Sequence, residues 1–209
     1  MDKYLIDLIA RMLDKSDKIM ETGFSSSDTI SWKALREAEE VNDEALIPQL
    51  ILFIDTEKDK KKRDKVYFLD HIAKNTGNPE GLDYLISCVN QETDKYIISS
   101  LLDRIADIHK PVGTDLQPLI QATKSDKWLI RHSAILSLNN SSDGLAETVL
   151  IDIITNSDES IDSTYANATL GDVGTARAIP FLEKNLRSRK KDVKGSAEYA
   201  IEEIKRRHR

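Results

Sequence analysis

Residues 161–201 read IDSTYANATLGDVGTARAIPFLEKNLRSRKKDVKGSAEYAI, and their apolar residues recur with the three- and four-residue spacing of helices. Three helical patterns, IDSTYANATL, ARAIPFLEKNL and VKGSAEYAI, are separated by GDVGT and RSRKKD, which are typical of turns. We expect GDVGT to close the first of these helices as a C-cap. The first and third patterns each contain an Ala followed four residues later by Leu or Ile, at Ala166/Leu170 and Ala197/Ile201.

This four-residue apolar pair occurs five times at a nearly constant interval. Measured between the second members of successive pairs, the intervals are 33, 33, 32 and 31 residues. A period of this length indicates one helical hairpin stacked on copies of itself, because a single hairpin cannot bury its own apolar face. The sequence therefore predicts an all-α fold, a right-handed α-solenoid of about six stacked helical hairpins. The pairs are Phe68/Ile72, Leu101/Ile105, Ala134/Leu138, Ala166/Leu170 and Ala197/Ile201.

The repeat predicts one domain over residues 1–209. Residues 1–41 form a divergent N-terminal cap, with a helix over 2–20, the turn GFSSSD and a second helix containing Trp32. Residues 42–114 form divergent repeats and residues 115–209 clear ones. The charged stretch EKDKKKRDK, from 57 to 65, is predicted to be a solvated turn, and PVGT, from 111 to 114, to end the second helix of the third repeat.

Charge is divided unevenly along the chain. Residues 176–209 contain eleven Lys or Arg and five acids, which gives +6, and since the whole chain carries −6, residues 1–175 carry −12. Between His132 and Ala176 there is no Lys or Arg, although seven acids occur there. Such a stretch repels nucleic acid and attracts basic protein surfaces, unless it only keeps the protein soluble.

The composition favours a cytoplasmic protein. The first twenty residues carry charges throughout, so they resemble neither a signal peptide nor a membrane span. Cys88 has no second cysteine with which to form a disulfide, and we interpret it as a small buried hydrophobic residue.

The side chains that carry chemistry are scattered. The four histidines, His71, His109, His132 and His208, lack a second His or Cys at helical spacing, so we expect no metal site. Phosphate-binding, nucleotide-binding and hydrolase motifs do not occur in the sequence. We therefore expect no cofactor and no catalytic residue, and predict that the protein is not an enzyme.

The string ANATLGDVGTARAIPFLEKNL, from Ala166, resembles the junction of two HEAT repeats, in particular the short class of phycobilin lyases. IRHSAILSL, from Ile130, and VKGSAEYAI, from Val193, are similar to the start of that family's second helix. The resemblance is clearest over residues 115–209 and implies a HEAT-like fold, which serves many unrelated functions. It places Arg131 and Lys194 at the family's basic position and Asp126 and Asp158 at its turn aspartate.

The second helices of helical solenoids usually line the binding side, and positions one, two, five and six before each pair's second member are expected to be exposed there. Tyrosines among acids on such a face form a plausible binding surface, because tyrosine supplies contact area at low entropy cost. Alternatively, Tyr67 and Tyr165 pack between repeats and do not bind a partner. The predicted partner-binding residues are Tyr67, Asp70, His71, Tyr96, Asp103, Arg104, His132, Asp158, Glu159, Asp162 and Tyr165.

Two functions compete. The first is a non-catalytic protein-binding module that holds a basic partner on an acidic surface, most concretely an immunity protein that neutralises a basic nuclease toxin, or else an adaptor or assembly factor. The second is a nucleic-acid-binding HEAT-like protein or DNA glycosylase, which would use the basic residues near the C-terminus. Trp128, at the start of its helix, is predicted at a core or rim position.

Overall fold

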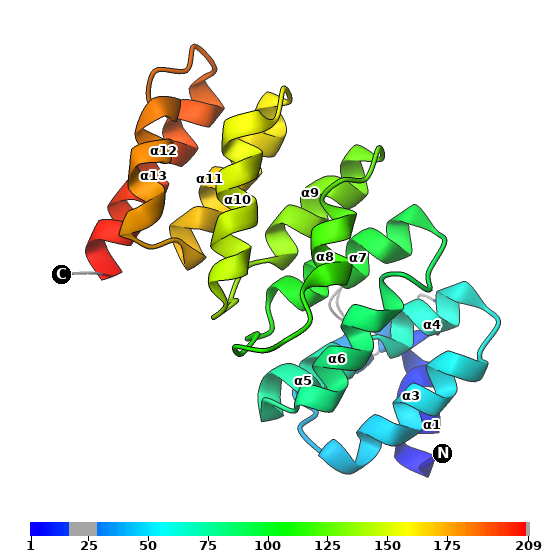
Figure 1. The fold of residues 1–209 in the computed structure, drawn as a ribbon. Coiled ribbons are helices and arrows are strands. Elements are labelled where there is room, and N and C mark those ends of the chain that lie inside the picture. Colours follow the sequence, from blue (N-terminus) through cyan, green and yellow to red (C-terminus); the bar gives the residue numbers. More distant parts are fainter. Residues whose placement is uncertain (17–28, 208–209) are drawn as a thin grey trace. The chain divides into compact units, whose positions relative to one another are not determined.

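The computed structural model describes residues 1–16 and 29–207, and these residues form helices and turns without a β-strand. The chain divides into two compact units, Met1–Leu85 and Ile86–Arg209 (Figure 1). The predicted all-α repeat fold is confirmed. Its handedness, the number of hairpins and the single solenoid over residues 1–209 stay predictions.

The described residues of unit 1 form six α-helices, the last of which runs across the boundary into unit 2. Asn75 Nδ2 donates to the carbonyl of Val41 at 3.0 Å and Tyr84 Oη donates to Asp55 at 2.6 Å, so bonds that span about one repeat join these helices. The elements are α1 (Lys3–Met12), α2 (Ile30–Glu39), a 3₁₀ turn (Glu44–Leu46), α3 (Ile47–Thr56), α4 (Lys60–Val66), α5 (Leu69–Thr76) and α6 (Pro79–Cys88).

Two predictions in unit 1 are wrong. The first helix ends at Met12 instead of residue 20, because the Asp14 carboxylate accepts the Ser16 backbone N–H at 2.6 Å and competes with the helical pattern. The charged stretch from 57 to 65 is helical from Lys60 onward, since Asp59 caps it by accepting the Lys61 N–H at 2.9 Å. The predicted turn GFSSSD lies outside the described residues.

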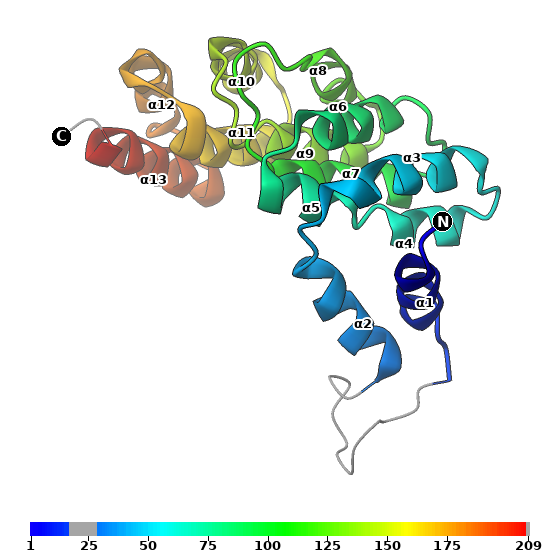
Figure 2. The same cartoon turned by 90° about the horizontal axis from the view of Figure 1, so that it is seen from below.

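Unit 2 has two helical layers. In Figure 2 the first helices of the hairpins, α8, α10 and α12, lie above the second helices, α7, α9, α11 and α13. Each second helix packs on the next, from α7 through α9 and α11 to α13. The elements are α7 (Lys95–Ala106), α8 (Gln117–Ala122), α9 (Trp128–Ser137), α10 (Gly144–Asn156), α11 (Ser160–Val173), a 3₁₀ turn (Ala176–Ala178), α12 (Ile179–Asn185) and α13 (Lys191–Arg207).

The repeating pairs form the core, as predicted. All ten members are buried, and the three first members that are Ala let neighbouring helices approach closely. Cys88 is buried as well.

Two helix ends in unit 2 differ from the prediction. Helix α7 stops at Ala106, five residues before PVGT, and the buried Lys110 side chain caps it by donating to the carbonyls of Ile105 and Ile108, both at 2.7 Å. Helix α11 continues through Gly171 to Val173, so GDVGT is not a simple C-cap. A Cβ on Gly171 would lie 2.9 Å from the Tyr199 ring, which shows that this glycine permits a close approach of α13.

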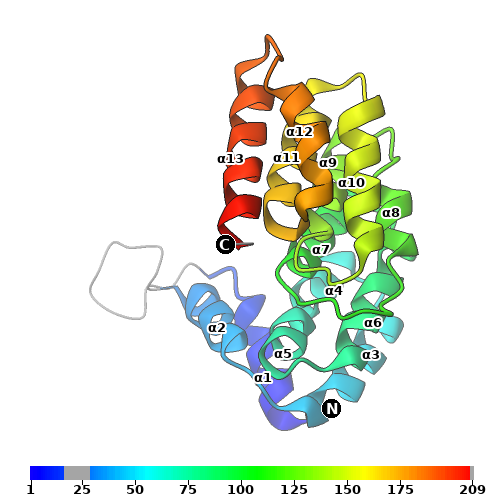
Figure 3. The same ribbon diagram turned by 60° about the vertical axis from the view of Figure 1, so that its left-hand side comes forward.

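The last helix also closes the end of α11. The Arg207 guanidinium donates to the carbonyls of Gly171 and Gly174, where a helix C-terminus leaves acceptors without intrahelical partners. Figure 3 shows α13 beside α11 and α12, its neighbours in unit 2.

Candidate partner-binding site

The surface of the second helices in unit 2 that turns away from the first-helix layer is the candidate site, and we call it the second-helix face. Each of these four second helices carries an exposed large apolar or aromatic side chain. Tyr96 on α7 is 65% exposed and Trp128 on α9 is 64% exposed. Ile161 on α11 and Tyr199 on α13 are exposed as well.

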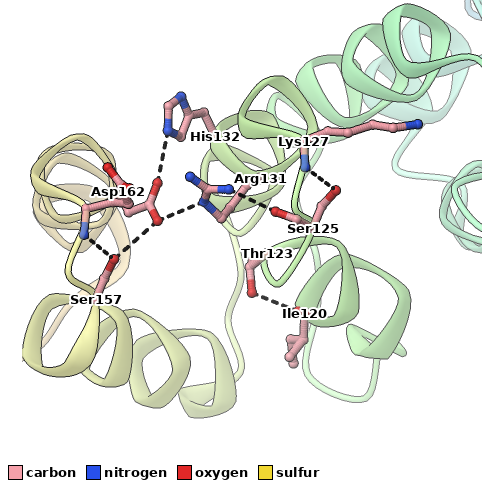
Figure 4. A network of polar contacts seen from close by, with 9 residues as sticks. Ile120, Thr123, Ser125, Lys127, Arg131, His132, Ser157 and Asp162 are labelled. Atoms are coloured by element: carbon pink, nitrogen blue, oxygen red, sulfur yellow. Dashed lines mark hydrogen bonds and ion pairs between the residues drawn. The ribbon is translucent and has the colours of Figure 1, made fainter.

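A buried polar network centred on Asp162 links α9 and α11 (Figure 4). Its Oδ2 accepts hydrogen bonds from Arg131 Nε at 2.8 Å and from the Ser157 hydroxyl at 3.2 Å. Its Oδ1 lies 2.9 Å from His132 Nε2, which donates because the carboxylate can only accept. Arg131 also donates to the Ser125 carbonyl at 2.9 Å, so the network joins the turns and second helices of two successive repeats.

Three aromatic rings pack together next to this network, and one of them, His132, is also part of it. The His132 ring is stacked on Tyr165 with centroids 4.7 Å apart and an interplanar angle of 17°. Trp128 also packs on His132, with ring centroids 5.6 Å apart and an interplanar angle of 50°. Because Asp162 fixes His132, and His132 supports Trp128, the exposed indole is held by buried contacts.

Acids on the second-helix face carry raised pKa values. Partial burial, and then the nearby Asp107 charge, raise the pKa of Asp103, against a hydrogen bond with Ser133 that lowers it. Burial likewise raises the pKa of Asp172, where Arg207 acts in the opposite direction and Glu203 adds to the rise. The ionised form of Asp103 is thus disfavoured by its surroundings, and a cation brought by a ligand would stabilise it.

The structure separates the predicted binding residues into three groups. Tyr96, Asp103, Asp158 and Glu159 are exposed, as the prediction requires, although Asp158 and Glu159 lie at the turn before α11. His71, Arg104 and Tyr165 are half-buried. Their contact with a partner stays a prediction.

For the remaining four, the expected exposure is wrong. Tyr67 and Asp70 are buried in unit 1, and Asp70 lies 3.7 Å from the His71 ring. His132 and Asp162 are buried in unit 2, where they bond to each other. The positional rule failed because it treated helix faces as equivalent in every repeat, whereas buried polar pairs occupy several of these positions.

The same rule was wrong for Ser99, Ser133 and Ser137, which are also buried. The hydroxyls of Ser99 and Ser133 lie 2.8 Å apart and link α7 to α9. Arg131 and His132 are neighbours in the sequence, and both reach the carboxylate of Asp162.

Of the two positions predicted for Trp128, core or rim, the core is excluded, because the side chain is 64% exposed. The repeat contains a signal that Trp128 is exposed. Ten residues before the second member of each pair in unit 2 lie Lys95, Trp128, Ser160 and Lys191, and all except Trp128 are polar. An aromatic residue at an otherwise polar repeat position indicates a surface role.

Two further surfaces are basic. Four cations, Arg187, Arg189, Lys190 and Lys191, are exposed between α12 and α13, and α4 in unit 1 exposes Lys60, Lys61 and Lys62. Over residues 1–16 and 29–207, no three His, Cys, Asp or Glu side chains come together as a metal site. Within the same ranges, each helix is too short or too polar to span a bilayer.

The architecture defines a helical-repeat protein of the armadillo and HEAT class. Residues 116–202 match the family model for HEAT repeats, so this part of the chain is similar to that family, as the resemblance implied. A comparison with curated proteins found no match.

Two solved structures are similar to this chain in fold. A designed armadillo repeat protein in complex with the peptide (KR)4 superposes with a TM-score of 0.53 at 14% identity, covering 95% of this chain and 98% of the other. The crystal structure of an engineered protein gives a TM-score of 0.52 at 20% identity, covering 96% and 97%. These likenesses concern the fold alone.

Proposed function

We propose that this chain is a protein-binding repeat module and that its second-helix face holds a basic segment of a partner protein. The observation that carries the proposal is that acids and aromatic side chains are exposed along the same second helices, as with Tyr96 and Asp103 on α7. Exposed acids attract a cationic partner and exposed aromatic side chains supply contact area, so together they suit a basic segment.

Charge and shape support a basic partner. The −12 carried by residues 1–175 speeds the approach of a cationic protein, and Tyr96 and Trp128 offer contact area once it arrives. The (KR)4 peptide bound by the designed armadillo protein is an example of a basic ligand on a fold of this class. Asp158, Glu159 and Tyr165 complete the proposed contact set in unit 2.

In its most concrete form, the module is a cytoplasmic inhibitor that neutralises a basic nuclease toxin. An adaptor or assembly factor would use the same surface. A toxin gene directly beside the gene for this chain would favour the inhibitor, and a cluster of assembly genes would favour the adaptor.

Charge reversal on the second-helix face tests the proposal. Titration of a fluorescent (KR)4 peptide with the full chain, followed by anisotropy, should give saturable binding. Asp103→Lys combined with Asp172→Lys should weaken it about tenfold, because each exposed charge pair contributes up to about 1 kcal/mol.

A matched control makes the same change in net charge on the other layer. Asp152→Lys with Glu183→Lys alters exposed acids of α10 and α12 and should leave the affinity within about twofold. Equal losses in both double variants would mean that the peptide responds only to net charge, which contradicts a site on the second-helix face.

A nucleic-acid function is the second candidate, and the exposed cations between α12 and α13 favour it. A gel shift at low salt with duplex DNA and RNA decides between the two. We expect no complex at micromolar protein; a complex lost on Arg189→Glu with Lys190→Glu would replace the protein-binding proposal.

A further inference from the structure

Trp128 combines two properties that rarely occur together, exposure and rigid support. Its indole is 64% exposed, yet it packs on the buried His132 ring at a centroid distance of 5.6 Å. His132 is in turn stacked on Tyr165 and held by Asp162. A side chain fixed in this way loses little conformational entropy when a ligand covers it.

The Asp162 carboxylate, which holds His132, already has hydrogen-bond partners within the chain. The Asp162 carboxylate is buried and accepts hydrogen bonds from Arg131, His132 and Ser157. Its oxygens are therefore occupied by the chain itself and are not available to a ligand that binds at Trp128.

A π face distinguishes between the two basic side chains. The guanidinium of arginine is planar and weakly hydrated, so it stacks on an aromatic ring without giving up strong hydration. The ammonium of lysine is a compact, strongly hydrated charge that is better matched to a carboxylate. Acids such as Asp103 attract both, whereas Trp128 favours the first.

We propose that Trp128 is an arginine-reading platform, on which an arginine of the partner stacks and by which the module prefers arginine to lysine. This inference rests on the proposed function and specifies the partner's side chain. His132 and Asp162 act as positioning residues, because both are buried and support the indole without touching the ligand.

Two peptides of equal charge test the preference. The full chain is titrated with labelled (Gly-Arg)4 and (Gly-Lys)4 by fluorescence anisotropy. The arginine peptide should bind about two- to fivefold tighter, the ratio expected for one cation–π contact at an exposed site. Trp128→Ala should abolish the preference by weakening the arginine peptide, and Trp128→Phe should retain part of it.

Trp32 provides the matched control and a direct readout. It is the other tryptophan of the chain, it is exposed in unit 1, and Arg36 stacks on it at 5.4 Å. Trp32→Ala should leave both affinities unchanged. In the Trp32→Phe variant Trp128 is the sole tryptophan, and its emission should change on titration with the arginine peptide more than with the lysine peptide.

The outcomes separate this inference from the proposed function. Equal affinities for the two peptides, or equal losses for both in Trp128→Ala, overturn the platform while the basic-partner function stands. If neither peptide binds, both proposals fail. If oligo(dT) changes the emission of Trp128 and neither peptide does, the indole stacks on bases. This result also overturns the arginine assignment.

Discussion

Units 1 and 2 join successive helices with similar bonds but differ in how deeply their charges are buried. Asn75 in unit 1 donates to the carbonyl of Val41, 34 residues earlier, and Asn140 in unit 2 donates to that of Ala106, also 34 residues earlier. The bond spans one repeat in both units. Stacking by asparagine-to-carbonyl bonds therefore does not depend on how closely a repeat follows the HEAT pattern.

The ion pairs show the difference. In unit 1, Arg11 and Glu37 form two hydrogen bonds at 2.7 and 3.0 Å, with side chains 31% and 37% exposed. In unit 2, Arg131 and Asp162 are 19% and 7% exposed. A buried pair depends on both partners, whereas an exposed pair contributes little, so the two units should respond differently to the loss of one carboxylate.

Four acids of unit 1 line a cavity. The cavity has a volume of about 500 Å³ and lies between the start of α1 and the end of α2. Several of its acids already serve the fold: Asp2 caps α1, Asp43 caps the 3₁₀ turn, and Glu37 binds Arg11. Its lining consists of Asp2, Tyr4, Glu37, Glu40, Val41, Asn42, Asp43 and Leu46.

The largest effect is expected from Asp162→Ala. It removes the carboxylate that accepts hydrogen bonds from the half-buried Arg131 and the buried His132, and should lower the free energy of unfolding by about 3 kcal/mol. Glu37→Ala in unit 1 should cost about 1 kcal/mol or less, because that pair is partly solvated. Urea unfolding measures both, with Trp128 fluorescence in Trp32→Phe reporting unit 2 and Trp32 fluorescence in Trp128→Phe reporting unit 1.

Asp158→Ala is the control for Asp162→Ala, since Asp158 is an exposed acid near the same turn. Its cost should stay within about 0.5 kcal/mol. Similar costs for Asp162→Ala and Glu37→Ala would show that burial does not distinguish the units.

Sequence periodicity predicted the core well and the polar network poorly. The repeat reports apolar residues that recur in every unit, and all ten members of the pairs are buried as expected. The bond between His132 and Asp162 joins residues 30 apart that occur in one repeat only, so no period reveals it. Trp128 is intermediate between the predictable core and the unpredictable network. Its position in the repeat follows from the period, but only its departure from the polar residues at that position indicates exposure.

The helix ends provide a second contrast between the units. Helix α5 of unit 1 ends at Thr76 and is capped by Gly77, which has a φ of 71° and whose N–H bonds to the carbonyl of Ala73. At the equivalent position of unit 2, five residues after the second member of the pair, stands Lys110, whose buried ammonium caps α7. Burial lowers the pKa of Lys110 to about 7, against the opposing effect of Asp107.

Lys110 therefore makes the stability of unit 2 depend on pH. Between pH 7 and the ordinary lysine value of about 10.4, the unfolded chain binds a proton that the folded chain lacks, so stability rises with pH in this window. From pH 7 to 9.5 the unit 2 transition should gain about 2–3 kcal/mol relative to Lys110→Met, in which this dependence is absent. The unit 1 transition should not change in this variant; parallel pH profiles of the native chain and Lys110→Met would contradict the role of Lys110.

The smallest effect comes from the alanine of the repeated pair. Where unit 1 has Phe68, the clear repeats of unit 2 have Ala134, Ala166 and Ala197, all buried, so an added side chain finds no room. Ala134→Leu should cost roughly 1–3 kcal/mol by overpacking, seen as a lower urea midpoint of the Trp128 signal. Ala168→Leu is the control, because Ala168 is half-buried and should tolerate the change within about 0.5 kcal/mol. An unchanged midpoint for Ala134→Leu would mean that the close approach of the helices in unit 2 does not depend on the small residue at this position.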